Sequence, residues 1–126
     1  MPNRTKIISA AVFCFMSAGA SAGEVDVEAV SFRQAADGSY RFSVTLRHAD
    51  TGWDHYADRW EVLTPEGEII ATRTLYHPHV DEQPFTRSLS GVKIPDALSR
   101  LVIRGHDSVH GYGGEEKRVD LSAGAK

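Results

Sequence analysis

The stretch from Tyr40 to His48 constrains the fold more than any other part of the chain, because it alternates apolar and polar residues without a break. One face of this stretch carries Tyr40, Phe42, Val44, Leu46 and His48. The other face carries Arg41, Ser43, Thr45 and Arg47. A period of two is that of a β-strand with one face in a core. The sequence therefore predicts a strand here, with His48 at its end on the inward face.

Six further segments alternate in the same way and are bounded by turn residues, at about 25–33, 59–64, 68–76, 85–92, 100–106 and 115–121. Near Ala29-Val30 the apolar residues change from odd-numbered to even-numbered positions, which predicts a bulge there. Trp60 is the expected core anchor, because its ring buries the most apolar area. The chain is therefore predicted to be all-β, a seven-stranded antiparallel β-sandwich, with residues 122–126 as a disordered tail.

Seven short antiparallel strands with Trp60 on the third resemble the immunoglobulin and fibronectin type III sandwiches. The resemblance covers the layout of the strands, since the cysteine pair that links the sheets of immunoglobulin domains is missing. It implies an aligned two-sheet sandwich and names no activity.

The first 22 residues have the features of a signal peptide. A basic start leads into an apolar run from Ile7 to Met16, and Ala20-Ser21-Ala22 is the small-residue pattern after which signal peptidase cuts. The run is shorter than the roughly 20 residues that cross a bilayer as a helix. We therefore expect no membrane insertion and a single periplasmic or secreted domain over residues 23–126.

Cleavage after Ala22 would also change the chemistry of the chain. Cys14 and both methionines would be removed, which excludes disulfides and sulfur ligands for a metal in the mature chain. No small residues precede Cys14 as a lipoprotein signal requires, so we expect no lipid anchor. Arg4 and Lys6 would leave too, making the net charge more negative than the −3 of the whole chain. An acidic chain without basic clusters argues against nucleic acid as a partner.

The six histidines fall in or beside three of the predicted loops. Antiparallel strands with short connections alternate in direction, so the loops after the second, fourth and sixth strands must share one end of the sandwich. These loops hold, in order, His48 and His55, then His77 and His79, then His106 and His110. The sequence thus predicts a histidine-rich rim at one end.

Such a rim favours a site for a divalent transition metal, copper or zinc, since neutral imidazole suits both. In an extended segment His77 and His79 point to the same side, and we predict that they bind the ion with His106. His55 or His110 would be the fourth ligand, and His48 and His110 are the weakest candidates of the six. Four carboxylates could serve as further ligands or orient the imidazoles: Asp54, Asp81, Glu82 and Asp107.

Two other functions stay open. Trp53 and Tyr56 could stack on a sugar or pack on a protein, which would make the rim a metal-free recognition module for a carbohydrate or protein of the cell envelope. An enzyme is less favoured, because no nucleophile-elbow glycine pattern surrounds Ser108, although Asp107 and His110 lie beside it. We expect sequestration or delivery of the metal, for which an envelope protein could be the partner.

Overall fold

The computed structural model describes residues 23–124, and the expected signal peptide lies outside them. The described residues form seven strands and one helical turn: β2 (Asp26–Gln34), β3 (Tyr40–Arg47), β4 (Ala57–Leu63), β5 (Ile69–Thr74), β6 (Phe85–Val92), β7 (Arg100–Asp107), β8 (Lys117–Asp120) and α1 (Leu121–Gly124).

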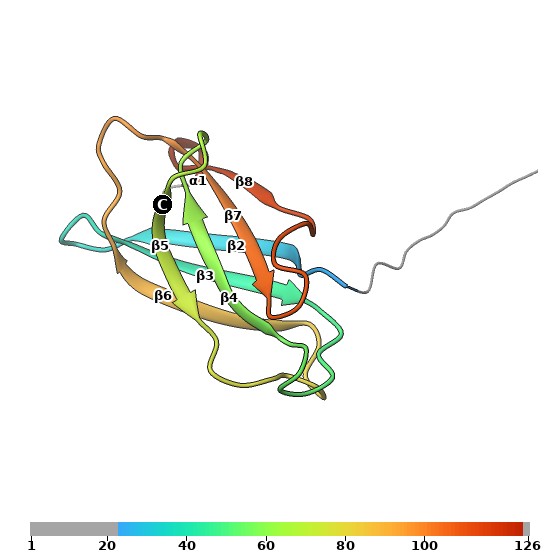
Figure 1. Ribbon diagram of the computed structural model, residues 1–126. Coiled ribbons are helices and arrows are strands. Elements are labelled where there is room, and N and C mark those ends of the chain that lie inside the picture. Colours follow the sequence, from blue (N-terminus) through green and yellow to red (C-terminus); the bar gives the residue numbers. More distant parts are fainter. Residues whose placement is uncertain (1–22, 125–126) are drawn as a thin grey trace, which may run out of the picture.

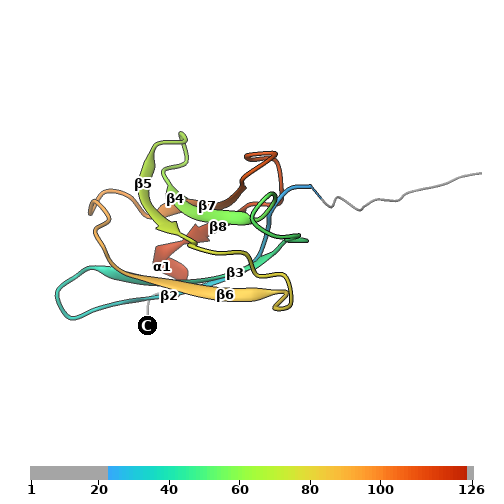
Figure 2. The same ribbon diagram turned by 60° about the horizontal axis from the view of Figure 1, so that its bottom comes forward.

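The strands form two antiparallel sheets that face each other (Figures 1 and 2). One sheet has the order β2-β3-β6 and the other the order β5-β4-β7-β8. The prediction of an all-β chain with seven antiparallel strands in two sheets is confirmed. Each predicted strand overlaps an observed one, and the ends differ by at most two residues.

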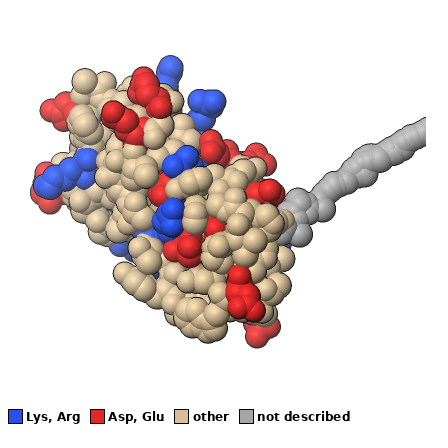
Figure 3. Space-filling model, viewed as in Figure 1, with Lys and Arg blue, Asp and Glu red and all other residues tan. Residues whose placement is uncertain are grey.

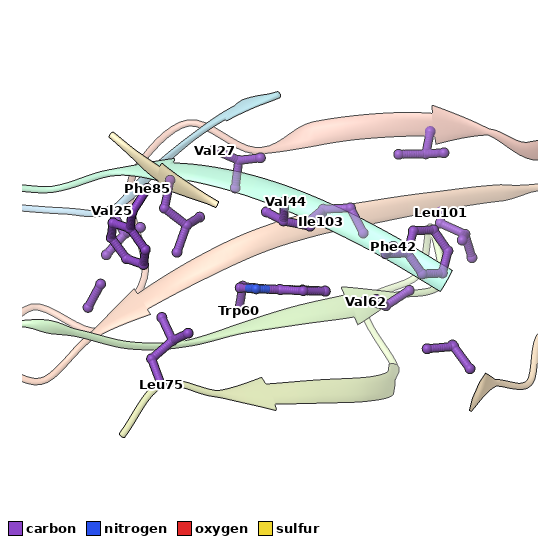
Figure 4. Close-up of a cluster of buried hydrophobic side chains, with 14 of the residues drawn as sticks. Val25, Val27, Phe42, Val44, Trp60, Val62, Leu75, Phe85, Leu101 and Ile103 are labelled. Carbon is purple, nitrogen blue, oxygen red and sulfur yellow. The ribbon is translucent and has the colours of Figure 1, made fainter. Parts of the chain in front are cut away.

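The core lies between the sheets and consists of the inward faces of the alternating strands (Figure 4). Phe42, Val44 and Leu46 of β3 are fully buried, as their alternation predicts. Trp60 of β4 is the largest fully buried side chain and lies at the centre of the cluster. The register between β2 and β3 shifts between Val27 and Ala29, close to the predicted bulge.

The carboxyl-terminal end differs from the sequence expectation. Leu121, expected to end the last strand, and residues 122–124, expected to begin a disordered tail, form the helical turn α1. Leu121 is 4% exposed and belongs to the core cluster, and its N–H donates to the carbonyl of Ser99. Burial of one apolar side chain therefore fixes the start of this segment. Residues 125–126 lie outside the described part.

The three histidine-bearing loops lie at one end of the molecule and are tied together by hydrogen bonds. The Asp50 carboxylate accepts the His79 N–H at 2.6 Å, which joins the β3–β4 loop to the β5–β6 loop. The Ser108 N–H donates to the Tyr56 carbonyl at 3.0 Å, which joins the β7–β8 loop to the same β3–β4 loop. The alternating direction of the strands, inferred from the sequence, thus predicts correctly that these three loops share one end.

The outer surface carries acidic and basic side chains interspersed on the face shown in Figure 3. One ion cluster, on β4 and β7, is nearly covered: Glu61 of β4 is 2% exposed and accepts from Arg59, Arg104 and Tyr112. The Arg104 guanidinium also lies over the Tyr112 ring at 3.7 Å. Among residues 23–124 there is no helix long and apolar enough to span a membrane.

Replacing the central tryptophan tests this account of the core. Trp60→Ala should lower the free energy of unfolding by about 3–5 kcal/mol, the usual effect of emptying such a volume. The matched control is Trp53→Ala, because Trp53 is 67% exposed, and its effect should stay within about 0.5 kcal/mol. Urea unfolding followed by circular dichroism measures both, and equal losses would contradict the assignment of Trp60 as the anchor.

Candidate metal site

A cluster of histidines and one aspartate closes the core at the histidine-bearing end. His48 directly follows β3, Asp107 is the last residue of β7, and His55 comes from the β3–β4 loop. One donor atom from each of these three residues lies within 4.8 Å of the other two. Among the described residues, no other group of three His, Cys, Asp or Glu side chains brings its donor atoms this close. His48 and Asp107 have fully buried side chains, while the His55 side chain is 20% exposed.

The Asp107 carboxylate is the centre of this cluster. Its Oδ2 lies 3.1 Å from His48 Nε2, 3.3 Å from His55 Nε2 and 3.3 Å from His110 Nδ1. Its Oδ1 accepts the backbone N–H groups of Val109, at 2.8 Å, and of His110. The carboxylate therefore uses one oxygen to shape its own loop and presents the other to three imidazoles.

These contacts set the charge of Asp107. Burial by itself raises the pKa of the carboxyl, but the N–H groups of His110 and Val109 and the imidazoles of His55 and His110 outweigh it. The balance lowers the pKa from 3.8 to about 2. Asp107 is thus a carboxylate at neutral pH, available as an anionic ligand.

Asp50 orients His48 from the opposite side. Its Oδ1 accepts from His48 Nδ1 and from the Ala57 N–H. When a neutral His48 donates from Nδ1 to this carboxylate, the lone pair of its Nε2 faces Asp107. A carboxylate that fixes an imidazole from behind in this way is typical of metal-binding histidines.

The start of the described chain also reaches the cluster. The carbonyl oxygen of Gly23 lies 3.3 Å from His48 Nε2 and 3.3 Å from His55 Nε2. Each of these two nitrogens therefore faces two oxygen atoms, one from Gly23 and one from Asp107.

Three of the residues named from the sequence come together here: His55, His110 and Asp107. His48, which the sequence analysis ranked among the weakest candidates, lies at the centre of the group. The alternation of β3 contained the signal, because it already assigned His48 to the inward face. Asp50 and Gly23 were not singled out, and no motif in the sequence marks them.

His77 and His79 form a pair of their own, with ring centroids 4.9 Å apart. His77 is exposed, whereas His79 is 6% exposed and stacks on Phe85 with 4.0 Å between the ring centroids. Burial lowers the pKa of His79, and the positive charge of Arg87 and the neighbouring His77 lower it further. Neither ring nitrogen of His79 has a hydrogen-bond partner among the described residues.

His106 lies on the outer face of β7, separate from the cluster. Its Nδ1 is 2.6 Å from Asp58 Oδ1 and its ring packs edge-on against Tyr112. Successive residues of a strand point to opposite faces, so an inward Asp107 requires an outward His106. The predicted grouping of His77 and His79 with His106 therefore has no counterpart in the contacts of these three side chains.

The other predicted residues lie on the surface of the same end. Asp54 and Asp81 are exposed. Glu82 pairs with Arg87 at 3.1 Å, and this hydrogen bond lowers the pKa of Glu82. Trp53 packs edge-on against Tyr56 at 5.6 Å between centroids and remains accessible to a ligand.

Comparison with known proteins gives one informative relative. A protein of Halomicrobium mukohataei named "Putative lipoprotein" is 43% identical over 102 residues, which is 81% of this chain and 50% of that protein. The chain thus spans about half the length of this relative. No family model matches the chain, and no solved structure matches it.

The environment of Asp107 predicts how stability depends on pH in chelator-treated protein. A carboxyl whose folded pKa is lowered to about 2 stabilises the fold above its ordinary value of 3.8, and this stabilisation is lost as the pH falls through about 2. The contribution at neutral pH is about 2 kcal/mol, at about 1.4 kcal/mol per pKa unit.

Asp107→Asn should remove this contribution, so its unfolding free energy should approach that of the wild type as the pH drops from about 5 to about 2. Urea unfolding over this pH range measures it. Asp54→Asn, at an exposed position, is the control. A constant difference between wild type and Asp107→Asn at all pH values would contradict the assignment.

Proposed function

We propose that the chain is an exported protein that binds one divalent transition metal ion, zinc or copper, through His48, His55 and Asp107. The observation that carries the proposal is the convergence of His48 Nε2 and His55 Nε2 on the same two oxygens, Asp107 Oδ2 and the Gly23 carbonyl. His110, with Nδ1 at 3.3 Å from Asp107 Oδ2, supplies a further imidazole at the edge.

The spacing of these atoms would admit a metal ion between them. Hydrogen bonds between N–H and O are usually 2.7–3.2 Å long. Four nitrogen–oxygen separations here are 3.1–3.3 Å. A tetrahedron with metal–ligand bonds of about 2.0–2.1 Å has edges of about 3.3–3.4 Å, whereas adjacent ligands in a square plane are about 2.9 Å apart. These four separations are compatible with the tetrahedral coordination that zinc prefers, and the donor atoms of His48, His55 and Asp107 all lie within 4.8 Å of one another.

The charges support the same proposal. Asp50 and Asp107, two buried carboxylates, contact His48 from opposite sides. A neutral His48 that donates from Nδ1 to Asp50 would turn the lone pair of Nε2 toward the Asp107 carboxylate and the Gly23 carbonyl, and a cation between these atoms would remove the repulsion. A divalent ion would convert these contacts into metal–ligand bonds and balance the buried negative charge.

Access to the site is provided on one side. The His55 and His110 side chains are 20% and 41% exposed, whereas His48 and Asp107 are fully covered. An ion would therefore enter past His110 and His55. A site open on one edge fits sequestration or delivery, in which the ion must be able to leave again.

Export rests on the signal peptide predicted for residues 1–22, and the name of the relative as a lipoprotein supports it. Lipoproteins are exported proteins of the cell envelope, so the shared sequence is compatible with a periplasmic or secreted location.

We propose that the β-sandwich of this chain is of the immunoglobulin or fibronectin type III kind. Its fourth strand, β5, pairs with β4 in the four-stranded sheet. In the constant-type immunoglobulin domain the fourth strand belongs to the other sheet, so the strand arrangement here differs from that type.

A recognition role for the same end is the second candidate. Six large apolar side chains are exposed among the described residues, and five of them lie in the three histidine loops: Trp53, Tyr76, Val80, Val109 and Tyr112. Exposed apolar residues grouped around one site indicate a contact surface. The surface could bind an envelope protein that receives the ion, or a protein or carbohydrate without any metal.

Metal titration of the mature protein distinguishes these functions. Calorimetry with Zn(II) and with Cu(II) should give one ion per chain, and His48→Ala or His55→Ala should weaken binding at least 100-fold, because each removes an imidazole ligand. The matched control is His77→Ala, which removes an exposed imidazole near the same loops and should leave the affinity within about twofold. Binding lost in His77→Ala but kept in His48→Ala would move the site to the His77–His79 pair.

The affinity should also fall with pH. A proton and a metal ion compete for the same imidazole lone pair, whose ordinary pKa is about 6.5. With two or three imidazole ligands, the apparent affinity for zinc should drop about 100-fold or more between pH 7.5 and pH 5.5. An affinity that does not change over this range would contradict imidazole ligation.

A further inference from the structure

We infer that signal-peptide cleavage completes the metal site, by creating an α-amine on Gly23 that binds the same ion together with the Gly23 carbonyl oxygen. This inference rests on the proposed function. It adds a ligand that no motif reveals, and it restricts the complete site to the processed protein.

Gly23 is held directly against the imidazole cluster. Its carbonyl oxygen is 3.3 Å from both His48 Nε2 and His55 Nε2. A Cβ atom built on Gly23 would lie 2.9–3.1 Å from three atoms of the His110 ring. A side chain at this position would require the His110 ring to shift, whereas glycine lets the main chain approach the cluster without that shift.

The segment that follows Gly23 is fixed by glycines of β7 and the β7–β8 loop. A Cβ on Gly105 would lie 2.4 Å from Val25 Cγ1, and one on Gly114 would lie 1.9 Å from the Val25 carbonyl oxygen. The side chain of Val25 is buried in the core between the sheets. These close contacts anchor the chain two residues after Gly23.

Two hydrogen bonds secure the same segment. The Glu115 N–H donates to Asp26 Oδ1 at 2.8 Å, and the Val27 N–H donates to the Glu115 carbonyl at 2.8 Å. Figures 1 and 2 show the start of the described chain at the histidine-bearing end, beside the loop that leads from β7 to β8. The position of Gly23 is thus supported by the contacts of the residues that follow it.

Cleavage changes the chemistry of the Gly23 nitrogen. Hydrolysis of the Ala22–Gly23 peptide bond by signal peptidase adds water, leaving a carboxylate on Ala22 and an amine on Gly23. An amide nitrogen has no available lone pair for a metal, whereas a deprotonated amine is a good nitrogen ligand. Amine nitrogen and carbonyl oxygen of one residue are joined through Cα and C, so both can bind one ion in a five-membered ring. Because the amine is tethered beside the ion, its binding is intramolecular and strengthens the whole site.

The test compares two forms of the mature protein that differ by one residue, one beginning at Gly23 and the other at Ala22. Both keep the Gly23 carbonyl and all histidines, but only the first has its amine on Gly23. Each is titrated with Zn(II) and with Cu(II), and the Cu(II) forms are examined by electron paramagnetic resonance. His55→Ala is made in both forms as the control for the imidazole site.

We expect the form that begins at Gly23 to bind both ions at least 10-fold more tightly, and its Cu(II) spectrum to show one more nitrogen donor. His55→Ala should weaken binding in both forms. Equal affinities and identical Cu(II) spectra, with binding still lost in His55→Ala, would overturn the role of the amine and leave the proposed imidazole site standing. Failure of both forms to bind either ion would overturn the amine ligand together with the metal site itself.

Discussion

The burial of one carboxylate, that of Asp107, is the constraint on which this end of the molecule depends. A carboxylate that is fully removed from solvent requires compensation, and Asp107 obtains it from two backbone N–H groups and the imidazoles of His55 and His110. The N–H groups come from its own loop, so Asp107 also determines the turn that follows β7. Loop shape, local charge and the grouping of the histidines are thus consequences of the same buried group.

Further hydrogen bonds behind the cluster hold the loops together. The Gln83 side chain accepts the His48 N–H at 2.9 Å and donates to the His79 carbonyl at 2.9 Å. Asp50 contacts His48, Ala57 and the His79 N–H, so it joins two loops behind the cluster. These bonds join the β3–β4 loop to the β5–β6 loop, and the bond from the Ser108 N–H to the Tyr56 carbonyl joins the β7–β8 loop to them. Preorganisation of this kind reduces the entropy lost when a ligand binds.

Much of the fold could be predicted from the sequence, because strict alternation leaves few choices for a segment such as Tyr40–His48. The same rule predicts which loops share an end. It also places His48 inward, and the inward positions of Leu101 and Ile103 extend by two-residue steps to Asp107. The alternation of inward and outward residues was thus a more reliable guide to the cluster than the spacing of His77 and His79.

Other parts of the site could not be predicted, because they depend on distances between segments far apart in the sequence. Gly23 is brought to the cluster by close contacts of Val25 with Gly105 and Gly114, about 80 to 90 residues away. Asp50 acquires its role only when the β5–β6 loop folds over it. The start of the helical turn α1 is likewise fixed by tertiary burial of Leu121, which its local sequence does not signal.

The central claim is that one metal ion lies between the imidazoles of His48 and His55 and the Asp107 carboxylate. A crystal structure of the mature protein grown with Zn(II), with anomalous data collected on both sides of the zinc absorption edge, tests it most directly. The account predicts a single strong anomalous peak about 2.0–2.2 Å from His48 Nε2, His55 Nε2 and Asp107 Oδ2. A peak at the His77–His79 pair, or none at this end of the sandwich, would contradict it.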